Sequence, residues 1–194
     1  MATLLYIRDV NNALLLLGIS EEGESVRYKL SRTLYAEIGA PSKGAVLSDS
    51  AMEIIKRYDE EYRAKKKALS LLSYSDKNEC GLKRRLSQAG FSQDVSEKCA
   101  EEMVSLGYID EERQLKRIIL NEANVKLRGP MKILPTLIGK GYASDDARRI
   151  MRELSDSGEI DFRENARRLL EKRGVDLADK DEVKKLLYRN GYKI

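Results

Sequence analysis

The sequence has no histidine and no tryptophan, and it contains only two cysteines and three prolines in 194 residues. Without histidine, the chain lacks the usual general base near neutral pH and the commonest zinc ligand. Cys80 and Cys99 are too few for a zinc site, and we expect both to be reduced and at least half-buried. These absences favour a protein that is not an enzyme and that needs no metal and no cofactor.

Long apolar runs are also missing from the chain. No run approaches the about 20 residues that span a bilayer, and the first residues do not follow the pattern of a secretory leader. We therefore expect a cytoplasmic protein with no membrane partner. Aromatic residues make up only 6% of the chain and charged residues 35%, which favours a solvated helical protein over a β-sandwich or a disordered tail.

The net charge of +4 is divided unevenly along the chain. Residues 1–62 contain 7 Lys and Arg against 10 Asp and Glu, a net charge of −3, whereas residues 63–194 contain 29 against 22, a net charge of +7. The second part is therefore the basic one. Nucleic acid and an acidic protein surface are both reasonable partners for it, and an ordinary solvated charged face is the alternative.

Five glycines recur at two matching offsets. Gly107, in the sequence Gly-Tyr-Ile-Asp, returns 51 residues later as Gly158 in Gly-Glu-Ile-Asp. A second series, in which each glycine precedes an aromatic residue, returns after 51 and then 50 residues: Gly90, Gly141 and Gly191. A fixed period of this size is typical of a tandem array of small units.

Each of these glycines predicts the end of a helix. A leucine or a methionine stands four residues before every one of them: Leu86, Met103, Leu137, Leu154 and Leu187. Glycine readily takes the left-handed conformation that ends a helix. We expect Asp110 and Asp161 to cap the helices that follow, and the aromatic residues after the second series to close the core of their units.

The repeat defines the predicted architecture. We expect a mainly α fold of tandem three-helix repeats, the last one incomplete by a helix, preceded by a small α+β N-terminal segment with a β-hairpin. The predicted segments are 1–62 for the strand-rich N-terminal part and its helix, and 63–109, 110–160 and 161–194 for the three repeats.

The N-terminal segment has strand patterns at 3–8, 13–19 and 25–30, and the last two are predicted to form the hairpin. Residues 13–17 also fit a turn of buried helix. A short helix is expected at 31–38 and a long one at 49–73, capped by Ser48. The basic run that starts at Arg63 marks a place where the long helix could break.

The helices of the repeats follow from apolar periodicity and capping signals. They are predicted at 78–89 and 93–105 in the first repeat, at 110–124, 130–140 and 145–156 in the second, and from Asp161 and from Asp179 in the third. Pro130 fits the first position of its helix, where a missing N–H costs nothing. Pro135 lies inside the same helix and predicts a kink or a shortened first turn.

Several motifs occur together, in one order, in the first two repeats: Ala68-Leu69, Leu71-Leu72-Ser73, Leu82 to Leu86, Gly107-Tyr108-Ile109-Asp110-Glu111, and Gly129-Pro130 with Ile133, Leu137, Lys140 and Gly141. In these motifs the array resembles the RecX family, regulators of the RecA recombinase. The resemblance covers residues 64–160. Two positions depart from the family pattern, because Gly81 replaces an acidic residue and Tyr74 replaces an arginine.

The resemblance implies a protein similar to RecX that binds RecA filaments on single-stranded DNA and limits filament growth, ATP hydrolysis and strand exchange. The expected partner is therefore the RecA filament, single-stranded DNA within it is a candidate contact, and the chain is expected to be a monomer. The residues alone indicate only a basic helical array.

Clusters of basic residues on the predicted second and third helices are the candidate contacts with a partner: Lys83, Arg84, Arg85, Arg148, Arg149, Arg152, Arg167, Arg168, Lys184 and Lys185. Some of them would align as a stripe if the repeats stack in register. A repeating binder can meet a polymeric target several times with modest contacts at each place.

Two other functions stay open at this point. A three-helix unit with a basic third helix resembles a helix-turn-helix, so the chain could be a stand-alone DNA-binding module. A nuclease would need clustered carboxylates for a metal ion, and we find none in the sequence. Tyr108, Tyr142 and Tyr192 could stack on bases, although we expect them to belong to the core.

Overall fold

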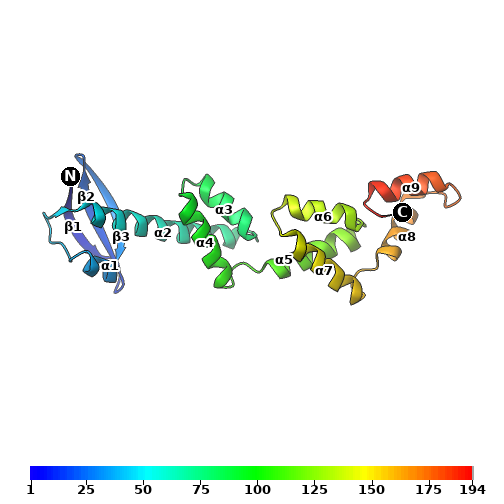
Figure 1. Cartoon of the computed structure of the whole chain (residues 1–194), viewed down its shortest axis with the longest axis horizontal. Helices are drawn as coiled ribbons and strands as arrows, with labels where there is room; N and C mark the ends of the chain where they lie inside the picture. Colours follow the sequence, from blue (N-terminus) through cyan, green and yellow to red (C-terminus); the bar gives the residue numbers. More distant parts are fainter. Residues whose placement is uncertain (194) are drawn as a thin grey trace. The chain divides into compact units, whose positions relative to one another are not determined.

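A computed structural model of the chain describes residues 1–193, so Ile194, the last residue of the predicted third repeat, lies outside the described residues. Figure 1 labels the helices and strands along the chain. The chain divides into two compact units. The first comprises residues 1–73 and 85–99, and the second comprises residues 74–84 and those from Ala100 onward. In the described part of the chain, no helix is both long enough and apolar enough to cross a membrane.

The first unit contains an antiparallel sheet in the order β3-β2-β1-β4. Its strands are β1 (Ala2–Asp9), β2 (Leu14–Glu21), β3 (Glu24–Ser31) and β4 (Val46–Leu47). Glu22 and Gly23 join β2 to β3 with φ of 51° and 91°, the left-handed pair of a two-residue hairpin turn. The predicted hairpin is confirmed, so the helical alternative for residues 13–17 was wrong, and β4 was not predicted.

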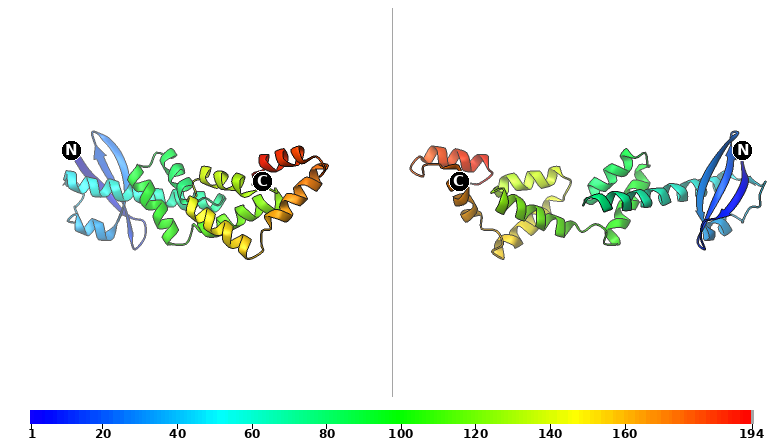
Figure 2. Two further views of the ribbon diagram at one scale, coloured as in Figure 1. Left: turned by 45° about the vertical axis from the view of Figure 1, so that its right-hand side comes forward. Right: turned by 180° about the vertical axis from the view of Figure 1, so that it is seen from behind.

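Two helices accompany the sheet, and one of them covers a face of it. Helix α1 (Arg32–Glu37) is capped by Ser31, and α2 (Asp49–Tyr74) is capped by Ser48, whose Oγ accepts a hydrogen bond from the amide of Ala51 at 3.2 Å. The N-terminal half of α2 lies along the sheet (Figure 2), and apolar residues of both form one core: Leu4, Leu15, Leu17, Ile19, Leu30, Leu47, Met52 and Ile55.

Helix α2 runs without interruption through the basic run that begins at Arg63, so the proposed break there was wrong. Ala64 and Ala68 are fully buried one helical turn apart, and alanine and lysine both favour helix. The boundary drawn between residues 62 and 63 falls inside this helix. The division of the chain into four segments stays a prediction.

The repeats have the predicted helices, and the mainly α fold with a small N-terminal sheet is confirmed. The helices are α3 (Glu79–Gln88), α4 (Gln93–Ser105), α5 (Glu111–Leu120), α6 (Pro130–Gly139), α7 (Ser144–Asp156), α8 (Phe162–Arg173) and α9 (Lys180–Arg189). Asp110, Asp161 and Asp179 cap α5, α8 and α9 through their side chains. Pro130 is at the start of α6, and the helix continues through Pro135.

The second repeat has a core of its own. Apolar side chains from α5, α6 and α7 meet in it: Leu115, Ile119, Ala123, Ile133, Leu137, Tyr142, Ala147, Ile150, Met151, Leu154 and Ile160. The Tyr142 hydroxyl donates a hydrogen bond at 2.8 Å to Oε1 of Gln114, whose side chain is also buried. This bond satisfies two polar groups inside the core, where an unpaired one would be costly.

Helix α5 continues into a π-helical turn, η1 (Asn121–Val125), which was not predicted. The turn carries Glu122, which is only 3% exposed and forms ion pairs with Lys126 at 2.6 Å and Arg128 at 2.5 Å. Burial raises the pKa of this carboxyl, but the hydrogen bonds from Lys126 and Arg128 outweigh burial and hold the pKa below its usual range. The π-helical turn thus places the buried Glu122 carboxylate within reach of both Lys126 and Arg128.

The five repeat glycines all have positive φ, between 75° and 90°, which confirms them as helix ends. The residues after them differ between the two series. Tyr142 and Tyr192 are 7% and 5% exposed and close the cores of their units as predicted, and burial raises the pKa of Tyr192 to about 12. Tyr108 is 58% exposed, so that prediction was wrong for Tyr108, because Ile109 is the residue that packs there.

The third repeat docks onto the second through its backbone. The amide of Gly129 donates to the carbonyl of Asn190 at 2.8 Å, and the amide of Met131 donates to that of Gly191 at 3.0 Å. The end of α9 therefore contacts the start of α6. Tyr192 is buried beside Leu127 and Leu169, and its hydroxyl donates to the carbonyl of Leu127 at 3.1 Å.

A similar contact joins the second repeat to the start of α3. The Asn78 side chain accepts a hydrogen bond from the amide of Gly81 and donates one, at 3.0 Å, to the carbonyl of Lys140 at the end of α6. Gln114 donates to the carbonyl of Lys77 at 3.2 Å. In both places, the end of one repeat's second helix meets the start of the preceding repeat's second helix.

Candidate functional site

Three of the ten candidate basic residues are held in ion pairs. Lys83 lies 2.6 Å from Glu79 on α3, and the Arg167 guanidinium on α8 pairs with Glu164 at 2.9 Å. Arg149 on α7 has three partners: Glu112, Asp146 and Glu153. Hydrogen bonds to Glu153 and Asp146 raise the pKa of Arg149 above its ordinary value. These three side chains are less available to a partner than the sequence suggests.

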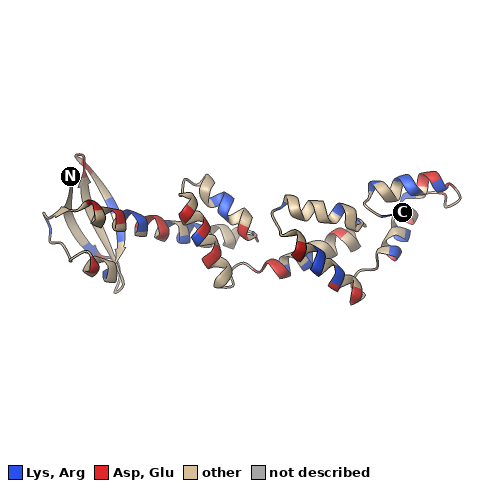
Figure 3. Ribbon diagram, viewed as in Figure 1, with Lys and Arg blue, Asp and Glu red and all other residues tan. Residues whose placement is uncertain are grey.

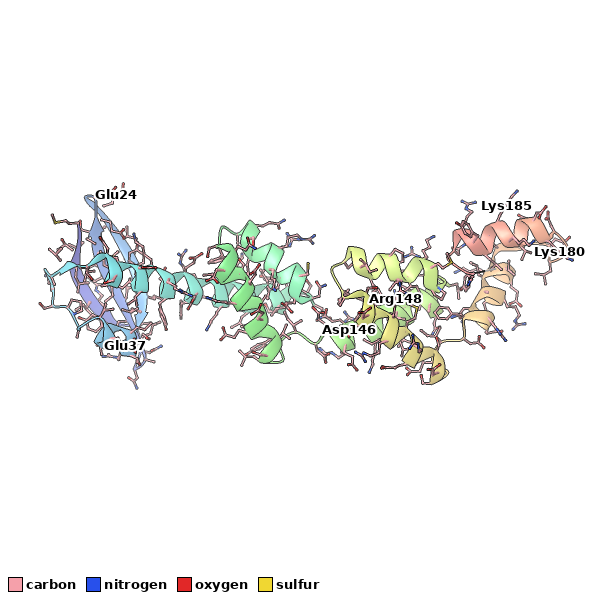
Figure 4. The ribbon with its side chains drawn as sticks, in the orientation of Figure 1. Glu24, Glu37, Asp146, Arg148, Lys180 and Lys185 are labelled. Atoms are coloured by element: carbon pink, nitrogen blue, oxygen red, sulfur yellow. The ribbon has the colours of Figure 1, made fainter. Side chains whose placement is uncertain are left out.

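The other seven form no ion pair within residues 1–193: Arg84, Arg85, Arg148, Arg152, Arg168, Lys184 and Lys185. All seven are exposed. Arg148 donates to Oγ of Ser144 at 3.3 Å, and Arg168 donates to the side chain of Asn165 at 3.3 Å. Arg148 on α7 and Lys185 on α9 are labelled in Figure 4.

On α7, Arg148 and Arg152 are four residues apart, so they lie on one face of the helix. The opposite face is buried in the core through Ala147, Ile150 and Leu154. Packing of that face fixes the direction in which the two arginines project. Acidic residues stand beside basic ones along α7 and α8 (Figure 3), which makes α7 a mixed surface in which these two arginines are the unpaired cations.

The idea of one basic stripe along the second helices is not supported by the residues at equivalent positions. Counting from the helix-ending glycines, Lys83 and Arg84 of α3 correspond to Leu134 and Pro135 of α6, and these in turn correspond to Lys184 and Lys185 of α9. The exposed residues of α6 include the apolar Met131 and Ile138, which are 53% and 46% exposed. The candidate cations Lys83, Arg84, Lys184 and Lys185 therefore have no basic counterpart at the equivalent positions of α6.

The third helices also differ. Arg148 and Arg152 of α7 correspond to Glu97 and Glu101 of α4 at an offset of 51 residues. The seven unpaired candidate cations therefore lie at separate places, on α3, on α7 and on the last two helices. Whether any of the ten contacts a partner stays a prediction.

The structure offers no site for a metal ion among residues 1–193, where no three Cys, Asp and Glu side chains cluster. Cys99 is buried as expected, whereas Cys80 is exposed, contrary to the expectation for both thiols. The Cys80 Sγ lies close to Gly141: a Cβ added to that glycine would lie 2.7 Å from it. The thiol therefore contributes to the meeting of α3 with the end of α6.

Comparison with known proteins adds a second line of observation. No protein-family model matches the chain. Curated proteins named "Regulatory protein RecX" do match it: those of Lactobacillus johnsonii, 30% identical over 114 residues (59% of this chain and 42% of the relative), and of Clostridioides difficile, 30% identical over 129 residues (66% and 58%). The protein of the same name from Lactobacillus gasseri is 28% identical over 119 residues (61% and 44%).

The chain is similar to proteins of the RecX family over 59 to 66% of its length. It spans about half the length of the curated relatives it matches. Solved structures agree in fold. The crystal structure of regulatory protein RecX has a TM-score of 0.72 at 18% identity and aligns with 100% of this chain and 95% of its own. That of RecX from Lactobacillus salivarius has a TM-score of 0.60 at 18% identity, over 70% and 90%.

Sequence reasoning missed the features of this chain that depend on tertiary contacts or on irregular backbone structure. The buried Gln114, the backbone contact at Gly129 and the ion pairs of Glu122 all join residues that are far apart in the sequence or lie in an irregular turn. One signal was available for the last of these. Glu122 stands four residues before Lys126, a spacing that allows pairing on a helix.

Proposed function

We propose that this chain is a regulatory protein, not an enzyme, that binds the RecA recombinase filament on single-stranded DNA and restrains filament growth, ATP hydrolysis and strand exchange. It would act as a monomer in the cytoplasm. The observation that carries the proposal is the match, over 114 to 129 residues, to proteins named as RecX regulators. Family resemblance in the repeat motifs supplies RecA as the partner.

The architecture is consistent with a polymeric target. Each repeat presents its own exposed cations, and modest contacts made at several places can sum to firm binding. On α7, the unpaired Arg148 and Arg152 project from one face. No local ion pair has to break before they can contact an acidic surface. Arg149 would first have to leave Glu153, which lies 2.9 Å away. We therefore assign the contact on α7 to Arg148 and Arg152.

The test is the rate of ATP hydrolysis by RecA on single-stranded DNA, with and without this protein. We expect the rate to fall at substoichiometric amounts, because a regulator that limits growth acts on many subunits of a filament. An unchanged rate at an excess of the protein would refute the proposal. Binding to duplex DNA that needs no RecA and weakens steeply with salt would favour the stand-alone DNA-binding module instead.

Charge reversal tests the face on α7. Replacing Arg148, Arg149 and Arg152 together by glutamate is expected to weaken filament binding with little change in melting temperature. The double variant Arg148→Glu with Arg152→Glu should account for most of that loss. A matched control is Arg163→Glu with Arg173→Glu on α8, which changes the net charge of the chain by the same amount. Equal losses in the two double variants would mean that only total charge matters.

A further inference from the structure

The first unit contains a cavity of about 610 Å³ between the edge strand β3 and the C-terminal half of α2. Its volume is within the range of ligand pockets, roughly 300 to 1,000 Å³. Four cations line it, Arg27 and Lys29 from β3 and Arg63 and Lys66 from α2. The two pairs are more than thirty residues apart in the sequence, and the fold brings them to one place.

Four cations and one carboxylate line the cavity, so its lining is positive. Its one carboxylate, Asp59, is 6% exposed and already has two partners, the amide of Lys29 at 2.9 Å and Nε of Arg63 at 2.7 Å. Asp59 thus holds β3 and Arg63 in position. Arg27, Lys29 and Lys66 form no ion pair within residues 1–193, so their charges face the cavity without a carboxylate partner.

Aromatic rings lie beside these cations. Tyr62 lines the cavity, and Nζ of Lys29 lies 4.5 Å from the centre of its ring. Tyr28 also lines it, and its hydroxyl donates to Glu21, which pairs with Lys56. Tyr28 also packs against the core of the sheet. Aromatic rings next to a row of cations are the combination that proteins use for single-stranded nucleic acid, since bases stack on rings while cations follow the phosphates.

We propose that this cavity binds single-stranded DNA, with a backbone phosphate among Arg27, Lys29 and Lys66 and a base beside the Tyr62 ring. Duplex DNA fits less well, because its bases are stacked inside the helix and cannot reach a ring at the wall of a cavity. An acidic peptide could meet the cations but would make no use of the two rings. The observations therefore favour a nucleic acid strand over a protein segment.

The inference goes beyond the proposed function, because it concerns direct contact with DNA through the N-terminal unit and is measured without RecA. The experiment is fluorescence anisotropy of a short labelled oligothymidylate titrated with the full chain at several salt concentrations. We expect Lys66→Glu to reduce the affinity about tenfold and to lower the salt slope by about 0.7 for each phosphate that the protein no longer neutralises. Lys66→Gln should give a smaller loss in the same direction.

The matched control is Lys43→Glu, the same change at another exposed lysine of the first unit, which is expected to alter the affinity by less than about twofold. Equal losses for Lys43→Glu and Lys66→Glu, or no binding of the oligonucleotide by the unaltered chain, would overturn the proposal. So would tighter binding of poly-glutamate than of the oligonucleotide with the same dependence on Lys66. If the chain does not bind the oligonucleotide, the proposed effect on RecA still stands. If the chain does not slow ATP hydrolysis by RecA, the proposed DNA site in the cavity still stands.

Discussion

Replacing Gly129 by alanine is expected to separate the end of α9 from the start of α6. A Cβ at this position would lie 2.2 Å from the carbonyl oxygen of Gly191 and 2.6 Å from the amide nitrogen of Tyr192. Both are backbone atoms, so no side chain can turn away to make room. The φ of Gly129 is −81°, which alanine adopts without strain, and the effect is therefore purely one of contact between the two segments.

The expected loss follows from what the contact contains. Two backbone hydrogen bonds, from Gly129 to Asn190 and from Met131 to Gly191, contribute about 0.5–1.5 kcal/mol each. Tyr192 is 5% exposed, and full burial of a large side chain stabilises by about 1.5–3 kcal/mol, of which part would disappear. We therefore expect the docking of α9 to weaken by about 2–5 kcal/mol, and a decrease of about 2 kcal/mol is roughly a 30-fold change in an equilibrium.

Amide hydrogen exchange followed by mass spectrometry measures this opening directly. Peptides that cover residues 180–193 should exchange about 30-fold faster or more in Gly129→Ala, while peptides from the core around Leu137 keep their protection. The control is Gly139→Ala in the same helix, where an added Cβ meets no atom within 4 Å. There, alanine should stabilise by about 0.5–1 kcal/mol because it favours helix.

Two results would refute the reasoning. If Gly129→Ala left the exchange of residues 180–193 unchanged, the backbone contact would not hold α9 in place. If the core of the second repeat lost as much protection as α9, the substitution would disturb α6 itself and not its contact with the third repeat.

Two further predictions concern the second repeat. Tyr142→Phe should lower the free energy of unfolding by about 1–2 kcal/mol in urea denaturation, because it leaves the buried Gln114 oxygen without its donor; no change would mean that water replaces the hydroxyl. Glu122→Gln should cost about 1.5–3 kcal/mol at pH 7, because it weakens the charged hydrogen bonds from Lys126 and Arg128. The pKa of Glu122 is lowered in the folded state, so its contribution to the free energy of unfolding is complete above the ordinary carboxyl pKa of about 4.3 and is lost as the pH falls through the lower folded value. The difference in the free energy of unfolding between the unaltered protein and Glu122→Gln should therefore shrink below about pH 4. A difference that stays constant down to about pH 2 would contradict the assignment.

Local signals predicted most of the fold. The hairpin follows from alternating residues around Gly23, and the helix ends follow from glycines that must take positive φ. The strand β4 has only two residues, too few for a periodic signal. The π-helical turn at Asn121–Val125 continues α5 without a break, so the apolar pattern of the sequence does not mark it.

The candidate site was less accessible to sequence reasoning. A row of arginines predicts a charged face, but whether a cation is available depends on its neighbours in space. Arg149 meets Glu112 from another helix, while Arg152, three residues further on, meets no carboxylate in the described chain. The cavity beside Tyr62 was invisible for the same reason, because it requires β3 and α2 to be brought together.

The residue at the start of each second helix decides what can follow it. Asn78, Gly129 and Asp179 occupy equivalent places, 51 and 50 residues apart. The side-chain amide of Asn78 can donate to an arriving carbonyl, and Gly129 leaves its own backbone open to one. Asp179 uses its carboxylate on the amides of Asp181 and Glu182 and has only acceptors to offer. Its negative charge would repel the carbonyl end of another helix, so a helix could dock at the start of α9 as in the other two places only if Asp179 were exchanged for glycine or asparagine.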